Sequence, residues 1–185
     1  TSFAIPDSVT KLDGGAFSYC ENLTALTVGN DSAFSVVDGV VFSKDLKTLI
    51  AYPNGKGAAY AVPAGTETID ARAFYGRKGV TSVTLPQGLR TIGDSAFQDS
   101  GITSLRLPDG LQKIGGSAFR DCAALTSLNI PASVTEIGGA AFWGCSALTE
   151  ILVDSGNTSF CSVDGVVFSK DMKSFSRAKM TPPTR

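Results

Sequence analysis

The sequence predicts a β-rich α/β solenoid built from repeats of about 22–23 residues, and three observations support this. An Ala-Phe dipeptide recurs, with its last three steps measuring 23, 22 and 23 residues. Its phenylalanines are Phe17, Phe74, Phe97, Phe119 and Phe142. An aliphatic-Pro dipeptide keeps the same period, at Pro6, Pro63, Pro86, Pro108 and Pro131. Finally, residues 102–122 (ITSLRLPDGLQKIGGSAFRDC) and 125–145 (LTSLNIPASVTEIGGAAFWGC) follow one pattern, as stacked repeats do.

Each element of the last complete unit, residues 125–145, has a physical reason. Apolar residues alternate over 125–130, which predicts a short strand with one face turned inward. Pro131 cannot donate to a ladder and therefore ends the strand. Residues 134–137 supply a second inward pair on the opposite wall. Gly138-Gly139 turns the chain, and 140–142 are expected to begin a short helical turn.

One unit cannot bury its own apolar face, whereas stacked units can. Stacking places equivalent residues about 4.8 Å apart across a strand ladder. The five Ala-Phe rings are therefore expected to form one buried column.

The unit resembles the BspA-like (Treponema pallidum-type) class of leucine-rich repeats. That class reads roughly I-P-x-x-V-T-x-I-G-x-x-A-F-x-x-C. The matching residues are Ile130, Pro131, Val134, Thr135, Ile137, Gly138, Ala141, Phe142 and Cys145. The resemblance covers nearly the whole chain and implies a right-handed leucine-rich-repeat coil. Arg77 and Ser100 depart from it, because they replace the cysteine that ends the other units.

Two further segments interrupt the period. The step from Phe17 to Phe74 is 57 residues, and the octapeptide 38–45 within it is identical to 164–171. Asp38-Gly39 between β-branched runs is a strong hairpin signal. We therefore predict β-hairpin or meander inserts near 34–55 and 160–178 that project from one solenoid domain over 1–180, followed by a flexible tail at 181–185. The BspA-like class commonly carries such an insert.

Composition excludes several function classes. The 185 residues carry a net charge of -1 and contain no histidine. This argues against nucleic-acid binding and against histidine-based catalysis or metal binding. No apolar run approaches the ~20 residues of a membrane span. The repeated Asp38 and Asp164 fit turns better than calcium loops. We expect a non-enzymatic chain without cofactor or metal. It opens at Thr1 without a signal peptide, so we regard it as a trimmed fragment.

The cysteines Cys122 and Cys145 hold the same position in neighbouring units. Their Cα atoms should lie ~5 Å apart, within the range of a disulfide. Their Cβ atoms run parallel, however, which favours free buried thiols. Cys20 and Cys161 have no assignable partner.

Candidate binding residues lie on the outward positions of the main strand ladder. We select Thr84, Arg106 and Asn129 as the centre of a broad contact surface; the alternative is a merely solvated sheet face. Tyr75, Arg77, Lys78 and Trp143 lie just after Ala-Phe turns, and Trp143 should point out of the core. It is either a partner-binding anchor or a ring in local packing, with Arg120 one unit earlier placed for a cation–π contact.

The resemblance implies a function in adhesion, since BspA-like proteins include adhesins for host extracellular-matrix proteins and for other bacteria. We expect a monomeric, secreted or cell-surface module that binds a host extracellular-matrix or other cell-surface protein. The alternatives are a structural spacer that displays another domain and a carbohydrate-binding surface carried by Trp143 and Tyr75. A hydrolase is the most distant reading, because nothing predicts a pocket with paired carboxylates.

Overall fold

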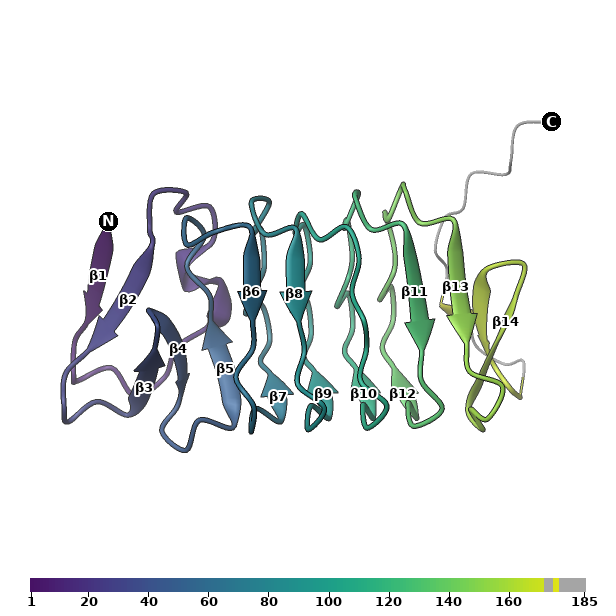
Figure 1. Cartoon of the computed structure of the whole chain (residues 1–185), viewed down its shortest axis with the longest axis horizontal. Helices are drawn as coiled ribbons and strands as arrows, with labels where there is room; N and C mark the ends of the chain where they lie inside the picture. The colour runs from purple at the N-terminus through teal and green to yellow at the C-terminus, as the bar shows by residue number, and fades with distance from the viewer. Residues whose placement is uncertain (172–174, 177–185) are drawn as a thin grey trace.

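The computed structural model describes residues 1–171 and 175–176, which form a solenoid of about seven turns (Figure 1). Two walls of short strands run along its length and enclose the core. No helix in the described part is long and apolar enough to cross a membrane.

The front wall consists of in-register parallel strands. These are β1 (Ser2–Ile5), β2 (Ala25–Val28), β6 (Ala59–Ala61), β8 (Ser82–Thr84), β11 (Ser127–Ile130) and β13 (Glu150–Val153). The pairs are β1 with β2, β6 with β8, and β11 with β13. Leu128 and Ile130 are 1% exposed while Ser127 and Asn129 face solvent, so the predicted alternation is confirmed.

The back wall is one seven-stranded sheet with the order β12-β10-β9-β7-β5-β4-β3. Its strands are β3 (Phe34–Val37), β4 (Val40–Ser43), β5 (Thr48–Ala51), β7 (Thr68–Ile69), β9 (Thr91–Ile92), β10 (Lys113–Ile114) and β12 (Glu136–Ile137). The isoleucines of β7, β9 and β10 are fully buried. This is the second inward-facing wall that the sequence predicts.

The first repeated segment does not project from the solenoid, which corrects our expectation. Strands β3 and β4 are antiparallel around a turn at Asp38 and Gly39, whose φ angles are 48° and 74°. Strand β5 then pairs in parallel with β7, with Leu49 opposite Ile69. Three strands of the segment thus extend the back wall, because its apolar residues find a place in the common core.

Only the first Ala-Phe turn is helical, so the α part of the expected class is not confirmed and the fold is strand-rich. In the described residues the single helical element is the 3₁₀ helix η1 (Gly14–Phe17). Ala140 and Gly144 flank Phe142 with φ of 57° and 77°, whereas an α-helix needs about −63°. The amide of Phe119 donates to the carbonyl of Ala141 in the next turn at 2.8 Å. Bonds between turns of the solenoid thus accompany short-range bonds within each turn, such as that from the Arg120 amide to the Ser117 carbonyl at 3.0 Å, and no continuous helix forms.

A column of aromatic rings runs through the core. Its members are Tyr52, Phe74, Phe97, Phe119 and Phe142, with successive centroids 5.0, 4.9, 5.5 and 5.9 Å apart. The predicted column is thus correct for four rings and wrong for Phe17. The long 57-residue step contains its own ring, Tyr52, and Phe17 instead packs against Phe3 in a second, smaller cluster.

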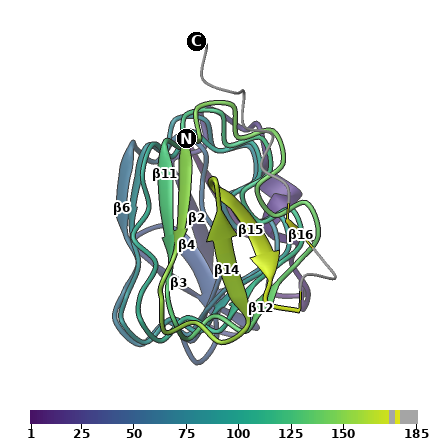
Figure 2. The ribbon, with the colours of Figure 1, turned by 90° about the vertical axis from the view of Figure 1, so that its right-hand side faces the viewer.

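The second repeated segment forms a separate antiparallel sheet at the C-terminal end (Figure 2). Its strands are β14 (Phe160–Val163), β15 (Val166–Ser169) and β16 (Phe175–Ser176). Asn157 anchors it: the buried amide donates to the carbonyls of Pro131 and Val134 at 2.9 Å, and accepts from the amides of Ser159 and Phe160. The predicted tail at 181–185, and part of the insert predicted to 178, lie outside the described residues.

Candidate functional site

The outward positions of the front wall are exposed as predicted. They are Ser82, Thr84, Ser104, Arg106, Ser127, Asn129, Glu150 and Leu152. Most are small and polar. Leu152 is an exception, because 46% of this large apolar residue is exposed.

A hollow of about 800 Å³ opens on this face across three successive turns. Its lining comes from residues 104–109, 127–131 and 152–154. Arg106 and Asn129 both line it, so two of the predicted residues share one site with Leu152. Thr84 lies on the neighbouring strand β8, outside the lining. Trp143 does not line it either.

The hollow coincides with a break in the front wall. The turn between β8 and β11 forms no strand on this wall and contributes only one isolated β-bridge, between Ser104 and Ser82. Figure 1 shows this turn as an irregular trace between the two arrows. Its side chains Leu105 and Leu107 are 6% and 4% exposed, so the hollow has an apolar floor.

Arg106 brings an exposed positive charge to the hollow. Among residues 1–171, the cations in ion pairs are Lys47, Lys56, Arg72, Lys78, Lys113 and Arg120. Arg106 has no such partner there, while Asp109 and Asp154 also line the hollow. A planar guanidinium can bind a carboxylate through two parallel hydrogen bonds. The hollow can therefore accept an acidic group next to an apolar contact.

A ladder of threonine hydroxyls, which our sequence analysis missed, braces one end of the front wall. The hydroxyls of Thr103, Thr126 and Thr149 each donate to the carbonyl of the threonine one turn earlier, at 3.2–3.3 Å. The signal was a threonine at the same place in each repeat. These bonds tie adjacent turns together beside the hollow.

Arg77 is fully buried. Its guanidinium donates to the carbonyls of Tyr52 (2.6 Å), Phe17 (3.0 Å), Tyr75 (3.1 Å) and Gly14 (3.4 Å). Burial lowers the pKa of Arg77 to about 10, so it stays protonated at neutral pH. Arg77 thus has a structural role where other turns place cysteine, and it joins the irregular first turns to the regular stack.

The four cysteines are free thiols, as favoured. The buried Cys122 and Cys145 donate to the carbonyls of Phe97 and Phe119, both at 3.0 Å. The hydrogen bond to Cys122, together with burial, raises the pKa of Cys145. That thiol stays protonated at neutral pH.

Trp143 is 44% exposed at its turn. Its expected cation–π partner, Arg120, directs Nε to Asp121 at 3.3 Å instead, and no contact joins Arg120 to the ring in the described residues. Tyr75 is half-buried and Lys78 exposed. Over the same part of the chain, no three histidine, cysteine or acidic residues come together to form a metal site.

Comparison with known sequences decides the family. Residues 1–50 and 50–173 match the BspA type leucine rich repeat region, in six copies. The chain belongs to the BspA-type leucine-rich-repeat family. No curated protein matches it.

Solved structures share the BspA-type fold. The pneumococcal vaccine antigen PcpA is 29% identical, with a TM-score of 0.78 over 87% of this chain and 40% of its own. A leucine rich cell surface protein of Faecalibacterium prausnitzii is 30% identical, with a TM-score of 0.74 over 85% of this chain and 43% of its own. The Treponema pallidum leucine-rich-repeat protein is 25% identical, with a TM-score of 0.50 over 64% of this chain. This chain therefore spans less than half the length of the first two proteins.

Proposed function

We propose that this chain is a non-catalytic, protein-binding module of a secreted or cell-surface protein, and that it binds through the front hollow. One observation carries the proposal: an exposed arginine without an ion pair lies in a hollow of about 800 Å³ that three turns of the solenoid build. The best-fitting partner surface presents an acidic side chain to Arg106 and an apolar one to Leu152. Asn129 can donate and accept hydrogen bonds between them.

The binding energy at this site would come from a few residues around Arg106. An exposed ion pair alone contributes only about 0–1 kcal/mol. A pair that becomes desolvated and bidentate contributes more, and arginine is enriched among the residues that dominate interfaces. The apolar floor and Leu152 would exclude water from such a pair. A solenoid also offers a large surface for its length, which suits contact with a protein partner.

The surface location and the partner class rest on similarity. One similar structure is of a cell surface protein and another is of a vaccine antigen. The resemblance to the BspA-like class supports the partner class: we propose that the module acts as a monomer and binds a host extracellular-matrix protein or another cell-surface protein. The net charge of -1 gives no reason to propose nucleic acid as a partner.

The test is a binding screen of the purified chain against immobilised extracellular-matrix and plasma proteins. A double variant, Arg106→Glu with Asn129→Lys, is measured beside it. Arg90→Glu is the matched control, because Arg90 is also exposed, has no ion pair in the described residues and lies outside the hollow. We expect a saturable signal that the double variant weakens about tenfold or more and that the control retains. Equal binding by all three proteins would refute the hollow as the site.

A structural spacer is the second candidate, favoured by the small polar side chains along most of the front wall. It predicts that the folded chain binds none of the proteins in the screen. A sugar site at the exposed Trp143 is the third, and Trp143→Ala alone would abolish it.

A further inference from the structure

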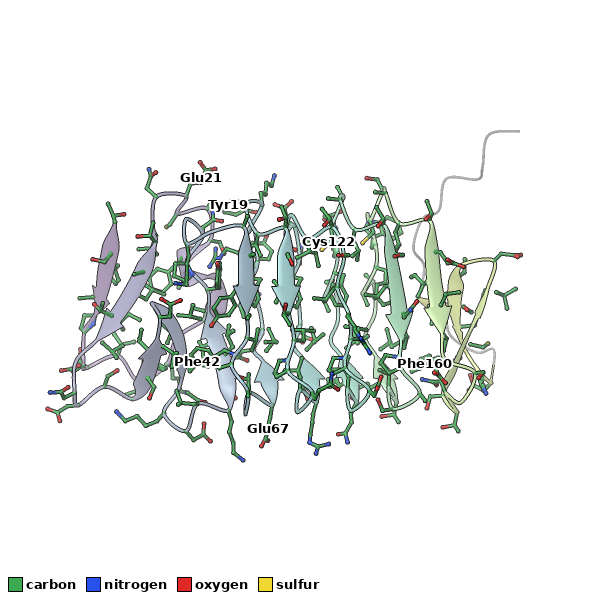
Figure 3. The ribbon with its side chains drawn as sticks, viewed as in Figure 1. Tyr19, Glu21, Phe42, Glu67, Cys122 and Phe160 are labelled. Atoms are coloured by element: carbon green, nitrogen blue, oxygen red, sulfur yellow. The ribbon has the colours of Figure 1, made fainter. Side chains whose placement is uncertain are left out.

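Three segments that are distant in the sequence meet at a small notch near the N-terminal end of the solenoid. The notch measures about 280 Å³ and is lined by Tyr19, Glu21, Asn54, Gly76, Lys78 and Gly79. Figure 3 shows Tyr19 and Glu21 close together at one edge of the solenoid. The notch shares no residue with the front hollow.

The ring of Tyr19 is fixed in place although the residue is 55% exposed. Its hydroxyl donates to Oδ2 of Asp99 at 3.2 Å. The ring of Tyr75 meets it nearly at right angles, with centroids 6.0 Å apart. The Tyr19 ring also lies so close to Gly76 that a Cβ at position 76 would come within 3.1 Å of the ring carbons. These contacts fix the Tyr19 ring while part of its surface stays exposed to solvent. The ring therefore needs little further ordering to bind a ligand.

The backbone at Tyr19 makes this placement unusual. Each of the five Ala-Phe turns has a left-handed residue two positions after its phenylalanine. The occupants are Tyr19, Gly76, Asp99, Asp121 and Gly144. Glycine and aspartate tolerate this conformation, whereas a bulky side chain is disfavoured there. Tyr19 is the exception, and its ring lies on the surface, where core packing does not require it.

The groups around the ring fit a sugar. The exposed part of an aromatic ring packs against the C–H face of a pyranose. Hydroxyls at the sugar's edge need both acceptors and donors. Glu21 accepts, Lys78 donates and Asn54 does both. Sites for drug-sized ligands measure about 300–1,000 Å³, so this smaller notch suits a single ring.

We propose that the notch binds a neutral hexopyranose residue, with Tyr19 as the stacking platform and Glu21, Asn54 and Lys78 as hydrogen-bonding groups. This site is separate from the protein-binding hollow, and each can fail without the other. A glycan on a partner or on a neighbouring cell surface would supply such a residue.

The test is a titration with methyl glucoside, methyl galactoside and N-acetylglucosamine, followed by NMR chemical shifts. Tyr19→Asn removes the ring and keeps a residue that tolerates the left-handed backbone. Tyr19→Phe keeps the ring and removes the bond to Asp99. Trp143→Ala tests the alternative sugar site at that exposed ring. Arg90→Ala is the control, since it changes an exposed side chain outside the notch. Far-UV circular dichroism confirms that each variant is folded.

We expect saturable millimolar binding of at least one sugar, with shifts at residues 19–21 and 76–79. Tyr19→Asn should weaken it about tenfold or more, Tyr19→Phe less, and the control Arg90→Ala not at all. No saturable binding by the folded wild type would overturn the proposal. So would binding that depends on Trp143 and not on Tyr19, or a protein ligand that needs Tyr19 when no sugar binds.

Discussion

Replacing Phe119 with alanine removes a ring from the middle of the aromatic column. Phe119 is fully buried and stacks on Phe97 at 5.5 Å and on Phe142 at 5.9 Å, with its plane within 7° of both. A buried phenylalanine replaced by alanine costs about 3–5 kcal/mol through lost transfer energy and the cavity left behind. We expect the upper part of this range, because a cavity closed above and below by flat rings collapses poorly. Urea unfolding followed by far-UV circular dichroism measures the free energy of unfolding.

Phe17→Ala is the matched control. Phe17 is half-buried and lies outside the column, tilted at 55° against Phe3. Its replacement should cost only about 1–2 kcal/mol, in line with the smaller apolar area that it buries. A loss below about 1 kcal/mol for Phe119→Ala, or an equal loss for both variants, would refute the column as the main packing element.

Three other predictions follow from the same packing. Arg77→Cys introduces the residue that other turns have at this position but leaves several buried carbonyls without donors. Thermal melting should therefore show that the free energy of unfolding falls by about 2–4 kcal/mol. Unchanged stability would contradict the structural role of the guanidinium. Gly39→Ala should lower the free energy of unfolding, measured in urea, by about 1–3 kcal/mol. The reasons are that φ at Gly39 is +74° and that the new Cβ would come within 2.9 Å of the Cβ of Ala25. Unchanged stability would argue against this turn. With a thiol reagent under native conditions, the exposed Cys20 should react first, while Cys122 and Cys145 should react only on unfolding; fast labelling of either buried thiol would count against the described core.

The repeat itself could be predicted from the sequence because its cause is local and periodic. Inward residues recur at fixed spacing, so both walls and four rings of the column follow from the pattern. Phe17 was misplaced because the ring before Phe74 in the column is Tyr52. Tyr52 follows Ala51 and lies 22 residues before Phe74, so it keeps the period, but a pattern restricted to Ala-Phe passes over it.

The repeated octapeptide illustrates a second limit of the sequence. Both copies turn at an Asp-Gly pair, with nearly identical φ angles at Asp38 (48°) and Asp164 (49°). The first copy joins the back wall through β5, whereas the second forms a sheet of its own. Identical local residues cannot encode this difference, because the neighbouring turn that each copy meets decides it.

The candidate site was predictable only in part. Alternation along the strands correctly turned Arg106 and Asn129 outward. The break in the front wall beside Arg106 arises at a segment whose residues 102–108 read like any other repeat, so no sequence signal marked the hollow. The role of Arg77 could not be predicted, because its carbonyl partners come from three separate segments, at Gly14 and Phe17, at Tyr52, and at Tyr75.

The most direct test of the proposed function is a hydrogen-exchange footprint of the chain with the protein partner that the binding screen selects. We predict that binding slows exchange in 104–109, 127–131 and 152–154, the segments that line the hollow. The Ala-Phe turns and the back wall should exchange at their free rates. Protection confined to those turns or to the back wall, with the hollow unchanged, would contradict the front hollow as the binding site.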